Sequence, residues 1–279
     1  MKYPAGGFNP SAVCRLFGFR SNQPARVHRS LVAEKNSLLQ QSREHKDGWG
    51  IAYYGDRPEP EVAHGLGPAH ADPDFDRVSG LVSSHAVLAH VRLKSVGEVA
   101  VRNAHPFLRG RWAFAHNGTV RDFERHREAM ERLIAPELLA GLQGETDSER
   151  CFLIFLTELR GRSGIDAVAG ALARTMAAVS RLTDRDDQEK PTSMNFMVTD
   201  GELLVATRRH RTLFVSEGRA RGEGGLSHPP PEDGARLTQL VIASEELSSE
   251  SHWHQVAEDE LVGVDGAMVF RRWSRGALG

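Results

Sequence analysis

Cys14 is the residue of this sequence best suited to nucleophilic chemistry. It is one of two cysteines and stands at the head of the apolar, strand-like run CRLFGFR. A thiol needs a base to become the reactive thiolate at neutral pH. A cysteine at a chain's N-terminus carries its own base, because a free α-amine has a pKa near ~8. The alternative is an inert core cysteine, which is what we expect of Cys151 inside an amphipathic helical pattern.

The segment AHNG (115–118) could stabilise a reaction at such a cysteine. The Asn117 side-chain amide and the Gly118 backbone N–H, placed at the end of a strand, could form an oxyanion hole. Asn-Gly is also a strong signal for a hairpin turn. A helical pattern rather than a returning strand follows it, which weakens the hairpin interpretation.

Two charged residues, Arg92 and Asp147, stand at the ends of predicted elements. In GETDSERCF, Thr146 and Glu149 predict a capping box at the start of an apolar helix. Asp147 in the first turn suits the helix dipole or could bind a cation. Arg92 ends the apolar strand AVLAHVR, where it could bind a carboxylate or extend its guanidinium to water at an edge.

Several common sites are missing from the sequence. It contains no Walker A loop, no G-x-G-x-x-G after a strand, no H-E-x-x-H and no G-x-S-x-G. The thirteen histidines and two cysteines show no metal-ligand spacing, so we expect no metal and no cofactor. The nearest candidate, HWH (252–254), is interpreted as an exposed loop. The basic run TRRHR (207–211) is short, and we interpret it as a solvated face.

The composition is that of an ordinary globular protein. Hydrophobic residues make up 40% and charged residues 26% of 279 residues, with a net charge of −2. This charge gives no basic field for nucleic acid or anionic lipid. No apolar run is long enough to span a bilayer, and two cysteines are too few for a disulfide scaffold. We therefore predict a cytoplasmic protein.

The pattern of elements predicts one layered α+β domain. Strand-like runs come first, then two helices over TDSERCFLIFLTELR and GIDAVAGALARTMAAVSRL, then further strands. SLVAEKNSLLQQSRE (30–44) predicts an earlier helix. Asp200-Gly201 predicts the turn of a hairpin within SMNFMVTDGELLVATRR.

Taken in order, these segments resemble those of the class II glutamine amidotransferases, in particular the stand-alone members. The resemblance runs from Cys14 to about residue 265. It rests on the segments HKDGWG (45–50), AHVR (89–92), NAHPF (103–107), AHNG (115–118), ETDSE (145–149) and VIASEEL (241–247). It implies a four-layer αββα N-terminal-nucleophile fold, in which helices enclose two antiparallel sheets.

The resemblance also implies roles for individual residues. Cys14 would attack the side-chain amide of glutamine, with its own α-amine as the general base. Asn117 and Gly118 would hold the oxyanion, Arg92 would bind the substrate carboxylate, and Asp147 would bind its ammonium group.

Three more residues would shape the site: Asp47, Trp49 and His105. The segment after Arg92 lacks the Trp and the Thr-His pair of the members that are fused to synthetase domains. Either a separate synthetase subunit accepts the ammonia, or the enzyme cleaves γ-glutamyl peptides or conjugates. A third possibility is a ligand-binding module whose nucleophile is blocked.

This chemistry requires Cys14 to be the first residue. Residues 1–13 would therefore be a leader that is removed, or a misassigned start with Val13 at the position of the initiator. Residues 14–279 would form a single glutamine amidotransferase domain. The Gly/Pro-rich loop at 218–236 could gate the site.

Overall fold

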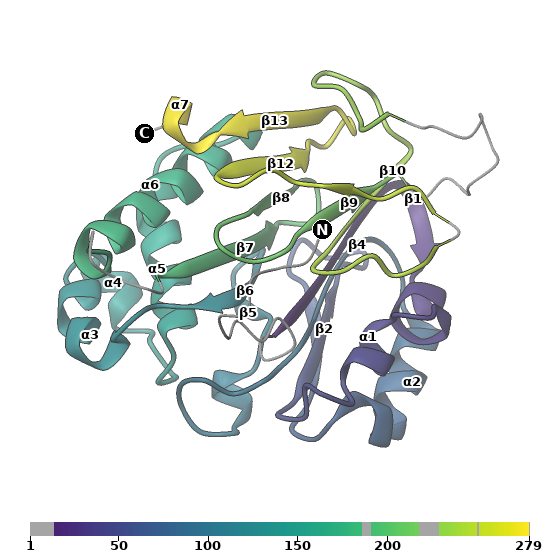
Figure 1. Cartoon of the computed structure of the whole chain (residues 1–279), viewed down its shortest axis with the longest axis horizontal. Coiled ribbons are helices and arrows are strands. Elements are labelled where there is room, and N and C mark those ends of the chain that lie inside the picture. Colours follow the sequence, from purple (N-terminus) through teal and green to yellow (C-terminus); the bar gives the residue numbers. More distant parts are fainter. Residues whose placement is uncertain (1–13, 186–190, 218–228, 250, 279) are drawn as a thin grey trace, which may run out of the picture.

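Two antiparallel sheets form the centre of the computed structural model, which describes residues 14–185, 191–217, 229–249 and 251–278 (Figure 1). The first sheet has seven strands in the spatial order β11-β9-β10-β1-β4-β2-β3. Its strands are β1 (Arg15–Arg26), β2 (Trp49–Tyr53), β3 (Glu61–Gly65), β4 (Ser83–Val91), β9 (Phe214–Ser216), β10 (Gln239–Ala243) and β11 (His254–Gln255).

The second sheet has six strands in the order β13-β12-β8-β7-β6-β5. They are β5 (Phe107–Arg109), β6 (Trp112–Thr119), β7 (Ser193–Thr199), β8 (Leu204–Thr207), β12 (Glu260–Val264) and β13 (Phe270–Ser274). Residues 1–13 and 218–228 lie outside the described part of the chain, and with them the predicted leader and much of the predicted gating loop.

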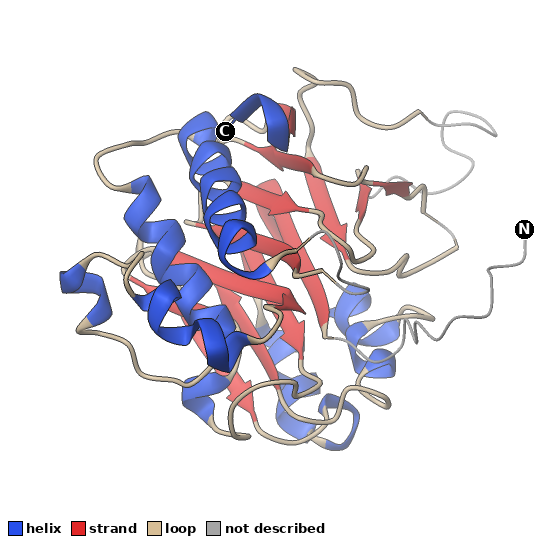
Figure 2. Ribbon diagram, turned by 60° about the vertical axis from the view of Figure 1, so that its left-hand side comes forward, coloured by secondary structure: helices blue, strands red, loops and turns tan. Residues whose placement is uncertain are grey.

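Helices cover the outer faces of both sheets (Figure 2). The second sheet is covered by α3 (Phe123–Glu131), α4 (Pro136–Leu139), α5 (Asp147–Leu159) and α6 (Ile165–Thr183), and α7 (Arg275–Leu278) follows β13. The first sheet is covered by the π-helical turn Arg29–Ala33, α1 (Leu38–Gln41) and α2 (Pro73–Leu81). The predicted four-layer αββα fold is confirmed.

Three apolar clusters hold these layers together. One lies between the two sheets and includes Leu16, Ala115 and Ile242. The other two lie between each sheet and its helices, one around Phe114 and the other around Trp49. Alternating residues of β6 therefore face opposite layers, with Ala115 and Asn117 toward the first sheet and His116 toward α5. None of the helices in the described ranges is long and apolar enough to cross a membrane.

The predicted hairpin at Asp200-Gly201 is confirmed, and Gly201 takes the left-handed φ of 90° that this turn requires. The single helix predicted over 30–44 is wrong. The chain forms two short helical turns there, because Asn36 is bound to the segment after β10. Its backbone N–H donates to Leu247 at 3.0 Å and its side chain donates to Glu246 at 2.9 Å.

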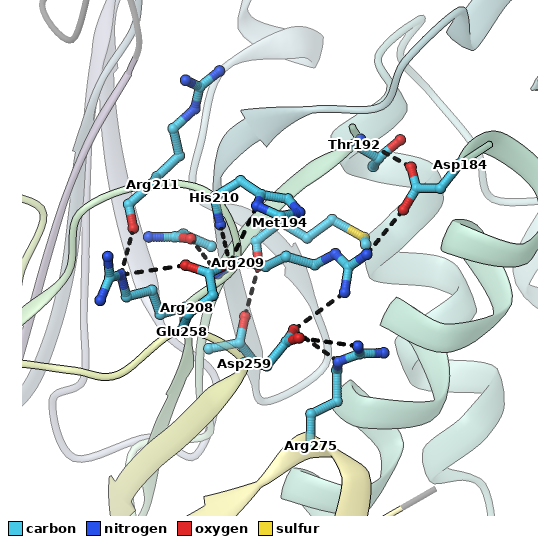
Figure 3. A network of polar contacts seen from close by, with 12 residues as sticks. Asp184, Thr192, Met194, Arg208, Arg209, His210, Arg211, Glu258, Asp259 and Arg275 are labelled. Atoms are coloured by element: carbon cyan, nitrogen blue, oxygen red, sulfur yellow. Dashed lines mark hydrogen bonds and ion pairs between the residues drawn. The ribbon is translucent and has the colours of Figure 1, made fainter. Parts of the chain in front are cut away.

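The basic run at 207–211 was expected to be a solvated face, which is wrong for Arg209. Its guanidinium is buried and pairs with Asp184 at 2.9 Å and with Asp259 at 3.1 Å (Figure 3). Arg275 binds the same Asp259 at 2.8 Å. These ion pairs connect the loop after β8 to the end of α6, to the residue before β12 and, through Asp259, to the start of α7.

The segment at 252–254 is not the exposed loop that was expected. His254 pairs with Val215 in the short strand β11, and Trp253 packs against the cluster on the outer face of the first sheet. The apolar area of an indole is large enough to draw this segment onto the sheet.

Candidate active site

Five of the eight predicted site residues line one cavity where strand ends of the two sheets meet, and Asn117, Asp47 and Trp49 lie outside its wall. Cys14 immediately precedes β1, and Arg92 immediately follows the neighbouring strand β4. Gly118 lies near the end of β6 in the other sheet, and Asp147 begins α5. With His105, these four residues line one cavity of about 20 Å³, which has room for about one water molecule.

Cys14 is half-buried and in contact with the chain just after Arg92. Its Sγ lies 3.3 Å from both the backbone N and the carbonyl O of Leu93. Burial raises the pKa of the Cys14 thiol, while the hydrogen bond from Leu93 and the charge of Arg92 lower it. Since burial dominates, the thiol is protonated at neutral pH and a base is needed to activate it.

Arg92 is buried, and its guanidinium holds the segment that covers Cys14. It donates to the carbonyl of Val96 at 2.8 Å and to the carbonyl of Glu98 at 3.0 Å. Burial lowers the pKa of Arg92, and a Cys14 thiolate and the nearby carboxylates of Asp47 and Asp147 raise it. An arginine fork has five N–H donors, so these two bonds orient the group and leave capacity for a carboxylate.

Asp147 is buried at the N-terminus of α5. One carboxylate oxygen accepts from the Val120 N–H at 2.8 Å and the other accepts from the Ser148 N–H at 2.9 Å. The predicted cap is half confirmed, because Thr146 accepts from the Glu149 N–H at 3.2 Å. The Glu149 carboxylate instead accepts from the N–H groups of residues 143 and 144. Through its hydrogen bond with the Val120 N–H, Asp147 connects α5 to the turn that follows Gly118.

Asn117 is buried and points between the sheets. Its Nδ2 donates to the Ser244 hydroxyl at 3.1 Å, and the same hydroxyl accepts from the Leu16 N–H at 2.9 Å. Ser244 therefore connects Asn117 on β6 to the strand that begins after Cys14. A side chain at Gly118 would not fit, because its Cβ would lie 2.0 Å from the Ser193 carbonyl oxygen.

The residues predicted to shape the site occupy different places. Asp47 accepts from the Lys94 N–H at 2.8 Å, which fixes the segment over Cys14. Trp49 lies on the helix side of the first sheet, where its indole donates to Asp72 at 2.9 Å. Its side chain supports β2 and α2 from behind the sheet.

His105 lines the cavity and packs on a second buried imidazole. Its ring centroid lies 4.3 Å from that of His90. Burial holds the pKa of both histidines well below the usual range, so both rings are neutral. The described residues contain no group of three or more His, Cys, Asp or Glu side chains able to hold a metal ion.

Sequence reasoning missed Ser244, although the segment that carries it was recognised. It also missed Arg15, whose Nη1 donates to the Cys14 carbonyl at 3.3 Å and whose Nη2 lies 3.4 Å from the Glu245 carboxylate. Burial lowers the pKa of Arg15, and the Glu245 carboxylate opposes this effect. An arginine directly after Cys14 in an apolar strand was a signal for it.

The chain is similar to proteins of known family along most of its length. Residues 13–221 match the family described as class-II glutamine amidotransferases. A yeast protein, "Probable glutamine amidotransferase DUG3" of Saccharomyces cerevisiae, is 29% identical over 226 residues. That alignment covers 70% of this chain and 63% of the yeast protein.

A relative with a stated reaction is the γ-glutamyl-hercynylcysteine sulfoxide hydrolase of Mycobacterium tuberculosis. It is 26% identical, with 78% of this chain and 75% of the relative aligned. The solved structure of a glutamine aminotransferase class-II domain protein from Silicibacter pomeroyi is 25% identical with a TM-score of 0.64. It covers 94% of this chain and 99% of its own. This chain belongs to the class II glutamine amidotransferases.

Proposed function

We propose that this protein is an amidohydrolase that cleaves a γ-glutamyl amide through a thioester on Cys14. The observation that supports this best is the single cavity shared by Cys14, Arg92, Gly118 and Asp147. It brings a thiol, a guanidinium, a backbone N–H and a carboxylate together from four separate segments. Glutamine is the smallest substrate that presents a carboxylate, an ammonium group and a γ-amide to such a set.

The reaction begins with the α-amine of an N-terminal Cys14, which removes the thiol proton. The thiolate attacks the amide carbon, and the oxyanion accepts hydrogen bonds from Asn117 Nδ2 and the Gly118 N–H. One of the two Asn117 donors already binds Ser244, which orients the amide and leaves the other for the oxyanion. The ammonium group of Cys14 then protonates the leaving nitrogen.

The products leave in two steps. The amine departs first and the γ-glutamyl group stays on Sγ as a thioester. Water, deprotonated by the same α-amine, attacks the thioester and releases glutamate. Arg92 and Asp147 bind the α-carboxylate and the α-ammonium throughout. Ammonia released from glutamine could pass to a separate synthetase subunit.

Substrate entry requires movement of the segment over Cys14. The cavity of about 20 Å³ is too small for a glutamine side chain. The chain from Leu93 to Val96 covers it, and Ser95 and Val96 form part of its wall. Once the segment has moved, a substrate carboxylate would bind the Arg92 donors that the carbonyls of Val96 and Glu98 leave free.

The experiment compares two forms of the protein, one beginning at Cys14 and one retaining residues 1–13, with the N-terminal residue of each established by intact mass. We expect glutamate release from glutamine only in the first form, and none after Cys14→Ala. A transient mass increase of one γ-glutamyl group would identify the thioester. Equal activity in both forms would contradict the role of the α-amine. Binding of glutamine without turnover would favour the blocked module.

A further inference from the structure

His105 carries a buried imidazole that the reaction above does not use. It is 4% exposed and lines the same cavity as Cys14, Arg92, Gly118 and Asp147. Neither of its ring nitrogens has a hydrogen-bond partner among the described residues. A neutral imidazole has one donor and one acceptor, and a buried polar atom without a partner is destabilising. A ring in this position therefore indicates a polar molecule bound in the cavity.

The second imidazole in the wall of this cavity has both nitrogens engaged. A carbonyl oxygen only accepts, so His116 Nε2 donates to the Ser193 carbonyl, at 3.0 Å. The Nδ1 of the neutral ring accepts from the Ser148 hydroxyl at 2.9 Å. His116 has no donor or acceptor left for a molecule in the cavity, whereas His105 has both.

Packing fixes the plane of the His105 ring. Its centroid lies 4.3 Å from that of His90 and 4.6 Å from that of Phe107, with interplanar angles of 35° and 65°. A side chain at Gly50 would collide with the His105 carbonyl, so the bare backbone of Gly50 lets this segment lie close against β2. The directions of the ring nitrogens are therefore set before a substrate binds.

His105 lies on the side of β6 to which the Gly118 N–H points. Gly118 pairs with Met194 of β7, but the Met194 N–H donates to the Arg209 carbonyl at 3.1 Å, on the β8 side of β7. Two residues opposite each other in antiparallel strands either exchange both hydrogen bonds or direct both N–H groups outward, so the Gly118 N–H points away from β7. On that side β6 has β5 as its neighbour, and the chain through His105 leads into β5.

The size and wall of the cavity fit a water molecule. Its volume of about 20 Å³ is that of about one water, and a molecule in so small a space lies next to both Cys14 and His105. A buried water makes about three hydrogen bonds. A ring nitrogen of His105 provides one, and the α-amine of an N-terminal Cys14 provides another.

We propose that His105 is a further catalytic residue, which binds the water molecule that hydrolyses the thioester on Cys14. This inference depends on the proposed reaction and assigns a residue to its second step. The α-amine of Cys14 takes one proton of the water, while a His105 nitrogen accepts a hydrogen bond from the other. The water oxygen attacks the thioester carbon, the carbon–sulfur bond breaks, and the proton passes from the ammonium group to Sγ. Glutamate and the free thiol result.

His105 orients this water and does not take its proton. Burial holds the pKa of His105 well below the usual range, so the ring is neutral at neutral pH and is a weak base. The α-amine of Cys14, with a pKa near ~8, is the stronger base and receives the proton.

The test measures how the thioester divides between water and a second nucleophile, in protein that begins at Cys14. With glutamine as the substrate, water converts the thioester to glutamate, and added hydroxylamine converts it to γ-glutamyl hydroxamate. The ratio of hydroxamate to glutamate at one hydroxylamine concentration reports on this step alone, whichever step limits turnover. Hydroxylamine brings its own nucleophilic nitrogen and does not need the bound water.

His105→Phe keeps a ring and removes both nitrogens. We expect the ratio to rise at least ~5-fold, the effect of one neutral hydrogen bond, because only the reaction with water slows. Without hydroxylamine, intact mass should show more of the γ-glutamyl adduct at steady state. His105→Gln has an amide that can bind water and should bring the ratio part of the way back. The matched control is His64→Phe, the same change in a ring that lines a neighbouring pocket, and it should leave the ratio unchanged.

The outcomes separate this inference from the proposed function. Thermal unfolding shows whether each variant is folded, and His105→Leu replaces His105→Phe if the latter is not. An unchanged ratio in the folded variant would overturn the water-binding role, since both nucleophiles would then react equally well or equally slowly. An equal rise of the ratio in His64→Phe would do the same. If the wild-type protein forms neither product, the proposed function itself fails, and the inference with it.

Discussion

Replacement of Asn117 with alanine tests the proposed oxyanion hole most directly. The side chain makes a hydrogen bond of 3.1 Å to Ser244 and is proposed to make a second one to the oxyanion. The two contributions can be separated, because Ser244→Ala removes the first and leaves the amide itself in place. The pair of variants therefore distinguishes catalysis from anchoring.

The expected magnitudes differ strongly. Loss of one oxyanion donor lowers kcat by ~100- to 1,000-fold, or ~2.7–4 kcal/mol. Loss of a hydrogen bond between two neutral buried groups costs ~1 kcal/mol, which corresponds to about fivefold. Ser244 keeps a donor in the Asn117 variant, because the Leu16 N–H still binds it at 2.9 Å. Asn117→Ala should therefore stay folded, with a free energy of unfolding lower by only ~1 kcal/mol.

The assay is glutamate release from glutamine by protein that begins at Cys14, with urea unfolding as the companion measurement. We expect a large loss of kcat with little change in KM for Asn117→Ala, and a loss of about fivefold for Ser244→Ala. Equal and small losses in both variants would refute the reasoning. They would mean that the amide only connects the two sheets.

Three further predictions follow from the packing. Gly118→Ala should lower activity more than ~100-fold, because the new Cβ would meet the Ser193 carbonyl and displace an oxyanion donor. The control is Gly67→Ala, whose Cβ would meet nothing within 4 Å and which should leave the activity unchanged. His105 stays neutral when folded because burial lowers its pKa, so its stabilising contribution is present above about pH 6.5 and declines as the pH falls. Each histidine of this kind contributes a decline of up to ~1.4 kcal/mol per pH unit. His105→Gln should therefore make the fall of the urea midpoint between about pH 7 and pH 5 less steep, while His90, which is buried in the same way, keeps its own share; an unchanged slope would contradict this role of His105. Arg209→Met should cost roughly 2–4 kcal/mol in urea unfolding, whereas the more exposed Arg275→Gln should cost about 1 kcal/mol; equal losses would contradict the buried network.

Candidate reactive residues and local turns could be predicted from the sequence. Cys14, Arg92, Gly118 and Asp147 were candidates by residue type and by their positions at strand or helix ends, and the resemblance to the class II glutamine amidotransferases gave them their proposed roles. The structure places all four on one cavity. The turn at Asp200-Gly201 was predicted because it depends on a few neighbouring residues. Such features are set by local dihedral preferences and side-chain hydrogen bonds, which a short segment contains in full.

Long-range contacts changed several predictions. The helix expected over 30–44 is interrupted because Asn36 binds a segment about 210 residues away in the chain. Arg209 is buried because Asp184 and Asp259, from two other elements, meet at its guanidinium. The local sequence contains no information about either partner.

The sequence by itself determined which groups could react and the order in which they occur. The tertiary structure decided which of them meet: Cys14 and Arg92 on one sheet, Gly118 on the other, and Asp147 on the helix above. It also placed Ser244 between Asn117 and the start of β1, which no motif indicated. The physical reason is that strand pairing and sheet packing join segments far apart in the chain, and the free energy of those contacts is absent from any one segment.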